Sequence, residues 1–146
     1  MIKILYPDYR PPIKQEEDKD FIFDPFRKKW LVLTPEEWVR QHFLQYLVQV
    51  KNYPSSLIAI EKQLQVGPVM KRFDIVVYDR NTQPFMVVEC KEMNVPLTEA
   101  VMQQALRYNG SLQAKFMVIT NGSHCMAFER NEQNFAPVNE LPLMEE

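Results

Sequence analysis

Two short apolar runs near the middle of the chain constrain its fold more than any other feature. Ile75-Val76-Val77 and Met86-Val87-Val88 are separated by Arg80-Asn81-Thr82-Gln83, which has the composition of a turn. This pattern predicts a β-hairpin with arms over residues 73–79 and 85–91. Both arms are predicted to be buried strands, because each apolar run is continuous rather than alternating.

Charged side chains stand near the ends of these strands, where a buried strand has no structural need for them. Asp74 lies in the first arm, and Glu89 and Lys91 lie in the second. Because side chains two apart on a strand point the same way, Glu89 and Lys91 are predicted to share one face, opposite Cys90. Asp74 could face that pair from the adjacent strand. A lone Glu-x-Lys is usually a solvated ion pair, but this context favours a functional cluster.

With a later Gln-x-x-x-Tyr element, these residues resemble the PD-(D/E)xK nuclease superfamily, and more narrowly the N-terminal nuclease domain of type I restriction enzyme R subunits. The resemblance extends from about residue 33 to residue 128. It is carried by residues 35–41, 72–78, 87–91, 104–108 and 119–122. It implies an α/β fold, with a restriction-endonuclease-like mixed β-sheet flanked by helices. Phe73 stands where the superfamily name expects Pro, as is common in the restriction-subunit branch.

The resemblance also implies a metal site and a substrate. Asp74 and Glu89 would bind one or two divalent ions, and Lys91 would act near the attacked phosphate. The expected ion is Mg²⁺, with Mn²⁺ able to substitute, because Mg²⁺ takes oxygen ligands and only one or two carboxylates. The backbone carbonyl of Cys90 is the candidate third ligand. DNA is the expected substrate, and restriction-modification subunits are candidate partners.

A further acid is expected from a helix predicted over residues 34–50, with Thr34 as its N-cap and Glu37 completing a capping box. On the helical period Glu36 shares a stripe with Val39, so it is predicted to point toward the sheet and to join the catalytic set. The resemblance supports this role. The alternative is that both glutamates only complement the positive end of the helix dipole.

A second helix, predicted over residues 98–108, carries Gln104 and Tyr108 on one face. Their match to the Gln-x-x-x-Tyr element assigns Gln104 to the catalytic set and Tyr108 to substrate binding. The alternative is a polar fringe on a packed helix. Lys71 and Arg72 are assigned to DNA contact at the rim of the site, although scattered basic residues more often form ordinary solvated surface.

The remaining sequence predicts one domain with short flanking segments. Residues 1–20 form a polar arm expected to be exposed and mobile, residues 21–138 form the nuclease-like domain, and residues 139–146 form a C-terminal tail. Further strands are predicted at residues 21–23, 30–33, 58–66, 116–120 and 125–129.

Composition excludes several other classes of protein. The chain of 146 residues is 46% hydrophobic and 25% charged, which is typical of a globular domain. No apolar run approaches the roughly 20 residues that cross a membrane, and no signal peptide is recognisable, so a cytoplasmic location is expected. The three glycines form no phosphate-binding loop. Cys90 and Cys125 are expected to be buried thiols, and His42 and His124 to be structural, which argues against zinc.

Three classes of function stay open at this point. The chain could be a metal-dependent nuclease, a binding module with the same fold but no useful turnover, or a docking domain whose acids form an ordinary ion-pair network. The complete set of Asp74, Glu89 and Lys91 favours the nuclease, because a decayed site would be expected to lose one of these costly charges. Glu61, one strand earlier, could be an outer ligand and is not assigned. The net charge of −2 offers no overall attraction to DNA.

Overall fold

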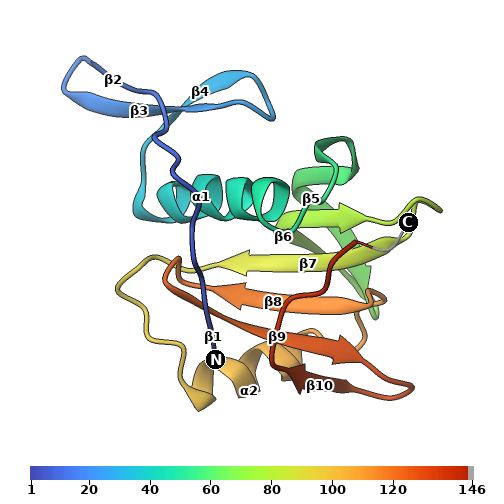
Figure 1. The fold of residues 1–146 in the computed structure, drawn as a ribbon. Coiled ribbons are helices and arrows are strands. Elements are labelled where there is room, and N and C mark those ends of the chain that lie inside the picture. Colours follow the sequence, from blue (N-terminus) through green and yellow to red (C-terminus); the bar gives the residue numbers. More distant parts are fainter. Residues whose placement is uncertain (145–146) are drawn as a thin grey trace.

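A computed structural model describes residues 1–144 of the chain. Its helices and strands, in chain order, are β1 (Ile2–Lys3), β2 (Ile13–Glu16), β3 (Lys19–Asp24), β4 (Lys29–Val32), α1 (Pro35–Gln49), the 3-10 turn η1 (Ser55–Leu57), β5 (Ile58–Val66), β6 (Val69–Tyr78), β7 (Pro84–Cys90), α2 (Glu99–Tyr108), β8 (Phe116–Thr120), β9 (His124–Arg130) and β10 (Phe135–Val138). Seven strands form one large sheet, and β2, β3 and β4 form a small second sheet. The small sheet lies on the side of α1 away from the large sheet (Figure 1).

The large sheet is mixed, as the sequence predicts. Its strand order is β1-β9-β8-β7-β6-β5, and β10 also pairs with β9. The predicted hairpin is confirmed: β6 and β7 are antiparallel, with Ile75 opposite Val88 and Val77 opposite Met86. Strands β7 and β8 are parallel, and α2 lies in the connection between them. Such a crossover is the usual way to join parallel neighbours, so the α/β class is confirmed.

Helix α1 covers one face of the large sheet. It starts where the sequence predicts, because the Thr34 hydroxyl accepts a hydrogen bond from the backbone N–H of Glu37 at 3.0 Å. Phe43 and Leu47 are fully buried on its inner side and pack in one core cluster with Ile75 and other inward residues of β6 and β7. The apolar run of β6 therefore contributes alternate residues to this face.

Helix α2 covers the opposite face. Thr98 caps it, accepting from the backbone N–H of Val101 at 3.3 Å, and its C-cap is Asn109, as predicted. Ala105 packs with Val76 and Val87 in a second core cluster. The middle strands are thus covered on both faces, which explains why their sequences read as continuous apolar runs.

Strand β6 changes faces at Asp74. Phe73 packs in the cluster on the α2 side and Ile75 in the cluster on the α1 side, although residues two apart on a regular strand point the same way. Glu61 on β5 lies opposite Asp74, between two bridged residue pairs, and has a positive φ of 54°. This irregularity places Asp74 where it can reach both α1 and the α2 side of the sheet.

The N-terminal segment is more ordered than expected. Residues 13–16 were expected to belong to an exposed and mobile arm, but they form strand β2 against β3. The segment Ile-Lys-Gln-Glu has no periodic pattern of its own, and pairing with β3 supplies the structure. Ile4 is also buried in the core. The predicted ribbon of β3 and β4 is confirmed.

The C-terminal segment also packs closely. Strand β10 was not predicted. It contains Pro137 and pairs only with β9 at the sheet edge, where proline is tolerated. Leu141 is 2% exposed, and the Lys51 amine donates to its carbonyl at 3.1 Å. The last two residues of the expected tail, 145 and 146, lie outside the described residues. The domain boundaries stay predictions.

Among residues 1–144 no helix combines the length and the apolar character needed to cross a membrane.

The turn between β8 and β9 depends on glycine. Gly122 has a φ of +94°, and an added Cβ would lie 3.2 Å from a methyl carbon of Val39. We expect Gly122→Ala to lower the free energy of unfolding by about 1–3 kcal/mol, the usual cost of a non-glycine residue held in such a conformation. Gly110→Ala is the matched control, since its Cβ would meet only the Leu106 carbonyl at 3.4 Å. Urea denaturation measures the free energy of unfolding of both variants. Equal losses would show that the turn does not require glycine at position 122.

Candidate active site

A cleft of about 540 Å³ opens beside the β6–β7 hairpin. The start of α1, the strands β6 and β7, and α2 all contribute to its wall. The lining residues are Glu36, Lys71, Arg72, Asp74, Glu89, Cys90, Lys91, Val95, Val101, Gln104, Ala105, Tyr108 and Ile119. Every residue that the sequence assigned to catalysis, metal or substrate is among them. The structure therefore brings the whole predicted set together, while the role of each residue stays a prediction.

Asp74 is held from two sides. Its Oδ2 accepts a hydrogen bond from the backbone N–H of Cys90 on β7 at 2.7 Å, and its Oδ1 lies 3.5 Å from Nη1 of Arg40 on α1. Burial raises the pKa of Asp74, and the nearby charges of Glu89 and Glu36 add to this effect. The Cys90 hydrogen bond and the Arg40 charge oppose the rise without cancelling it. A cation beside Asp74 would be favoured by this crowding of acids.

Glu89 is paired with a lysine, and that lysine is Lys71 rather than Lys91. The Lys71 amine lies 2.7 Å from Glu89 Oε1 and 2.8 Å from Oδ1 of Asn109. The Asn109 amide also donates to Glu89 Oε1 at 3.3 Å and is fully buried. Within the described part of the chain, no hydrogen bond or ion pair engages the second oxygen, Oε2. That oxygen is therefore the one available to a ligand in the cleft.

The remaining cleft residues carry few internal contacts. Lys91 follows β7 directly, with its backbone N–H donating to the Thr120 carbonyl at 2.7 Å. Its amine makes no hydrogen bond or ion pair with any residue between 1 and 144. Glu36, Gln104 and Tyr108 are exposed at the cleft, and Tyr108 retains 62% of its surface. These side chains are accessible to a bound molecule.

Glu37, rather than Glu36, is the buried glutamate of α1, at 6% exposed. The helical stripe placed Glu36 toward the sheet; Glu36 does line the cleft, but it is exposed. The predicted capping box forms only in part, because the Glu37 carboxylate accepts from Arg40 and Gln41. The helical period predicts which residues share a face, but it does not include the buried side chains that a residue bonds to. Such bonds explain why Glu37 is buried and Glu36 is not.

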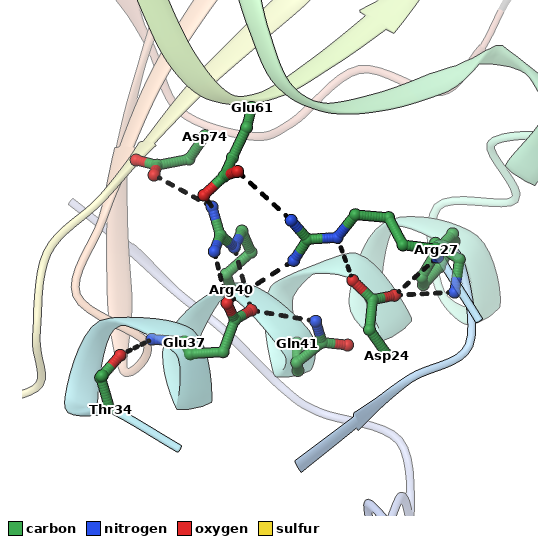
Figure 2. Close-up of polar contacts among 9 residues, drawn as sticks. Asp24, Arg27, Thr34, Glu37, Arg40, Gln41, Glu61 and Asp74 are labelled. Atoms are coloured by element: carbon green, nitrogen blue, oxygen red, sulfur yellow. Dashed lines mark hydrogen bonds and ion pairs between the residues drawn. The ribbon is translucent and has the colours of Figure 1, made fainter. Parts of the chain in front are cut away.

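An ion-pair network connects Asp74 to the small sheet (Figure 2). Arg40 lies between Glu37, Glu61 and Asp74. Arg27, which follows β3, contacts Glu61 at 3.4 Å, Glu37 at 3.6 Å and the fully buried Asp24 at 2.5 Å. Sequence reasoning missed this network. The local signals for it were two spacings of three residues, Asp24–Arg27 and Glu37–Arg40.

Other basic residues of the chain lie outside the cleft wall. Lys28 lines a different cavity, beside Phe26 and Ser55, and neither Lys29 nor Arg107 lines the cleft. His42 packs on Trp38 with ring centroids 4.1 Å apart, which fits the expected structural role. Both cysteines are free and buried, as predicted.

The donor chemistry of the cleft fits a hard divalent cation. Asp74, Glu89 and Glu36 offer carboxylate oxygens, and Cys90 offers a backbone carbonyl. Burial raises the pKa of the Cys90 thiol well above its usual value, so the sulfur stays neutral and is not a ligand. Within residues 1–144, no three Asp, Glu, His or Cys side chains are grouped closely enough to hold a metal by themselves. Water would have to complete the coordination of any ion bound there, as is usual for Mg²⁺.

The mixed sheet with one helix on each face, and the acidic cleft beside its central hairpin, define an α/β protein with a polar site at the strand ends. Residues 35–142 match the family model of the type I restriction enzyme R protein N terminus (HSDR_N). The chain therefore belongs to that family, and the matched range includes every residue that lines the cleft.

Comparison with solved structures gives a weaker likeness. The type IIG restriction endonuclease BpuSI is 16% identical, with a TM-score of 0.45, over 74% of this chain and 14% of that chain. A comparison with curated proteins gave no significant match.

Proposed function

We propose that this chain is a metal-dependent phosphodiester hydrolase that cleaves DNA as the nuclease domain of a restriction system. The observation that supports the proposal most strongly is the position of Asp74, Glu89 and Lys91. Asp74 and Glu89 lie on the adjacent strands β6 and β7, Lys91 follows β7 directly, and all three line one cleft inside the range that matches the R protein family. Mg²⁺ is the proposed cofactor, and Mn²⁺ is expected to replace it.

In this proposal Asp74 and Glu89 hold the metal ion, with the Cys90 carbonyl as a further ligand. When bound, the ion supplies positive charge that lowers the pKa of a coordinated water and offsets the charge of the phosphate. The Lys91 amine orients the nucleophile or offsets the charge that builds on the phosphate. Glu36 adds a third acid at the rim of the cleft.

The exposed residues of the cleft supply substrate contacts. Gln104 and Tyr108 lie along one side of α2, where they can contact the DNA backbone or support Lys91. Arg72 is exposed and free to contact a phosphate. Lys71 can do so only in part, because its amine is bound to Glu89 and Asn109. We propose restriction-modification subunits as partners and the cytoplasm as location, following from the family.

A second candidate is a DNA-binding or docking module on the same fold. One observation favours it: each of the two central acids already has a cationic partner, since Asp74 contacts Arg40 and Glu89 contacts Lys71. An ion-pair network of this kind is complete without a metal. The two candidates therefore differ in whether a divalent ion enters the cleft and supports cleavage.

The purified chain, incubated with supercoiled plasmid, should nick it slowly in Mg²⁺ or Mn²⁺. Calcium should bind without supporting cleavage, because its larger and more flexible shell positions the water loosely and lowers its pKa less. Gel electrophoresis measures nicking, and calorimetry measures binding of each ion. Cleavage in calcium equal to that in magnesium would contradict the role of the metal. Inactivity toward duplex DNA, single-stranded DNA and RNA with either Mg²⁺ or Mn²⁺ would favour the binding module.

A further inference from the structure

We infer that Arg40 takes the place of a second cation beside Asp74, so that the cleft binds a single divalent ion per chain. The inference rests on the proposed function, because it concerns the metal stoichiometry of the same site. Superfamily resemblance alone leaves one or two ions open. The contacts of Arg40 decide between them.

The Arg40 guanidinium contacts two carboxylates that could otherwise hold a divalent ion. Its Nη1 is 3.2 Å from Oε1 of Glu61 and 3.5 Å from Oδ1 of Asp74. These two carboxylates come from neighbouring strands, at the position that the β5–β6 register skips between its Ile60–Ile75 and Lys62–Phe73 pairs. A pair of carboxylates facing one point is a common arrangement for a divalent ion, and here that point is occupied by the guanidinium (Figure 2).

The guanidinium is fixed in this position. Its Nε donates to Oε2 of Glu37 at 3.0 Å and its Nη2 donates to Oε1 of the same carboxylate. Glu37 in turn accepts from Gln41 at 3.0 Å. The Arg40 side chain is only 9% exposed. Moving it aside would break a two-point bond to a buried carboxylate, so an incoming ion cannot displace it cheaply.

Glu61 is also unavailable as a metal ligand. Its Oε1 contacts Arg40 at 3.2 Å and its Oε2 contacts Arg27 at 3.4 Å, so both oxygens are paired with arginines. An arginine offers no lone pair to a metal, and its charge repels one nearby. A divalent ion on this side of Asp74 would therefore meet two fixed positive charges.

The side of Asp74 toward Glu89 differs from the side toward Arg40 and Glu61. Asp74 keeps unused lone pairs there, because each carboxylate oxygen accepts in more than one direction. Glu89 lines the same cleft, and its Oε2 has no hydrogen bond or ion pair among the described residues. Lys71, a cation of the cleft wall, is bound to the other Glu89 oxygen, Oε1. One ion between Asp74 and Glu89 is thus compatible with the arginines, whereas a second ion between Asp74 and Glu61 is not.

Titration with Mn²⁺, followed by the electron paramagnetic resonance signal of the free ion, tests the inference. Wild-type protein should bind one Mn²⁺ per chain. Arg40→Met should bind a second, because it removes the charge and exposes Glu61 and Asp74 to the cleft. Arg40→Lys is the matched control that keeps a cation, and it should bind one. Circular dichroism checks that each variant is folded.

Two Mn²⁺ ions in the wild type, or one in folded Arg40→Met, would overturn the inference. No Mn²⁺ in the wild type would instead contradict the proposed function. Glu61→Gln provides a test that does not require Arg40 to be changed, and Glu61 is 43% exposed, so the variant should fold. It should bind one Mn²⁺ with an affinity within about twofold of the wild type. A tenfold or greater loss would identify Glu61 as a ligand and refute the assignment.

Discussion

Asp74→Asn and Glu89→Gln should each slow Mg²⁺-dependent DNA cleavage by about 100-fold or more, the scale on which single electrostatic groups act in active sites. Each change removes a negative charge that the metal requires while keeping the shape of the side chain. The amide oxygen introduced at position 74 can still accept from the Cys90 N–H, and the one introduced at position 89 can still accept from Lys71, so the fold should survive. Single-turnover nicking assays give the rates.

Three further variants sharpen this test. The double variant of Asp74 and Glu89 should be no slower than either single one, because groups that act on one ion fail together. Lys91→Met should lose cleavage but keep Mn²⁺ binding, since its amine is not a ligand. Glu129→Gln, which removes an exposed acid on β9, should cleave at the wild-type rate. If Asp74→Asn cleaved within threefold of the wild type, the proposed site would be wrong.

The second large effect concerns stability. Glu37→Ala should lower the free energy of unfolding by about 3–5 kcal/mol, because it leaves the buried Arg40 guanidinium without its main partner. Glu36→Ala, one residue away, should change it by no more than about 0.5 kcal/mol, since Glu36 is exposed. Urea denaturation at neutral pH compares the two. Similar losses of unfolding free energy for both variants would show that burial of Glu37 does not determine its contribution to stability.

The stability difference should also depend on pH. Burial alone would raise the pKa of Glu37, but hydrogen bonds from Arg40 and Gln41, with the charges of Arg40 and Arg27, hold its pKa below the ordinary value. A carboxylate with a lowered folded pKa stabilises the protein above its unfolded pKa of about 4.3, and this contribution is lost as the pH falls through the folded pKa. The gap between wild type and Glu37→Ala should therefore narrow in acid. A gap that widened below pH 4 would contradict this account.

Local sequence determined most of the elements around the cleft. The two apolar runs predicted β6 and β7, Thr34 predicted the start of α1, and the range 98–108 predicted α2. These features are decided by residues close together in the chain, through turn geometry, capping and burial of a continuous apolar run. The resemblance to R subunits then indicated which side chains would meet, and all of them line one cleft.

Tertiary structure alone decided how those side chains are paired. Nothing in the spacing of Glu89-Cys90-Lys91 shows that Glu89 binds Lys71 and Asn109, since these come from β6 and from the end of α2. Strand β2 likewise exists through its partner rather than through its own pattern. Interactions of this kind depend on chain segments that only the folded sheet brings together.

Arg40, beside the site, is another residue whose pairing could not be predicted from the sequence. Its neighbours in the chain include one partner, Glu37 on the same helix, but the two carboxylates that place it at the site come from β5 and β6. The face change of β6 at Asp74 brings those carboxylates around the guanidinium. The sequence by itself thus determined the helices and strands around the cleft, and its resemblance to R subunits indicated which acids would meet there. Only long-range packing decided that Arg40 fills the position between Asp74 and Glu61. A buried charge takes its partners from the segments that fold around it.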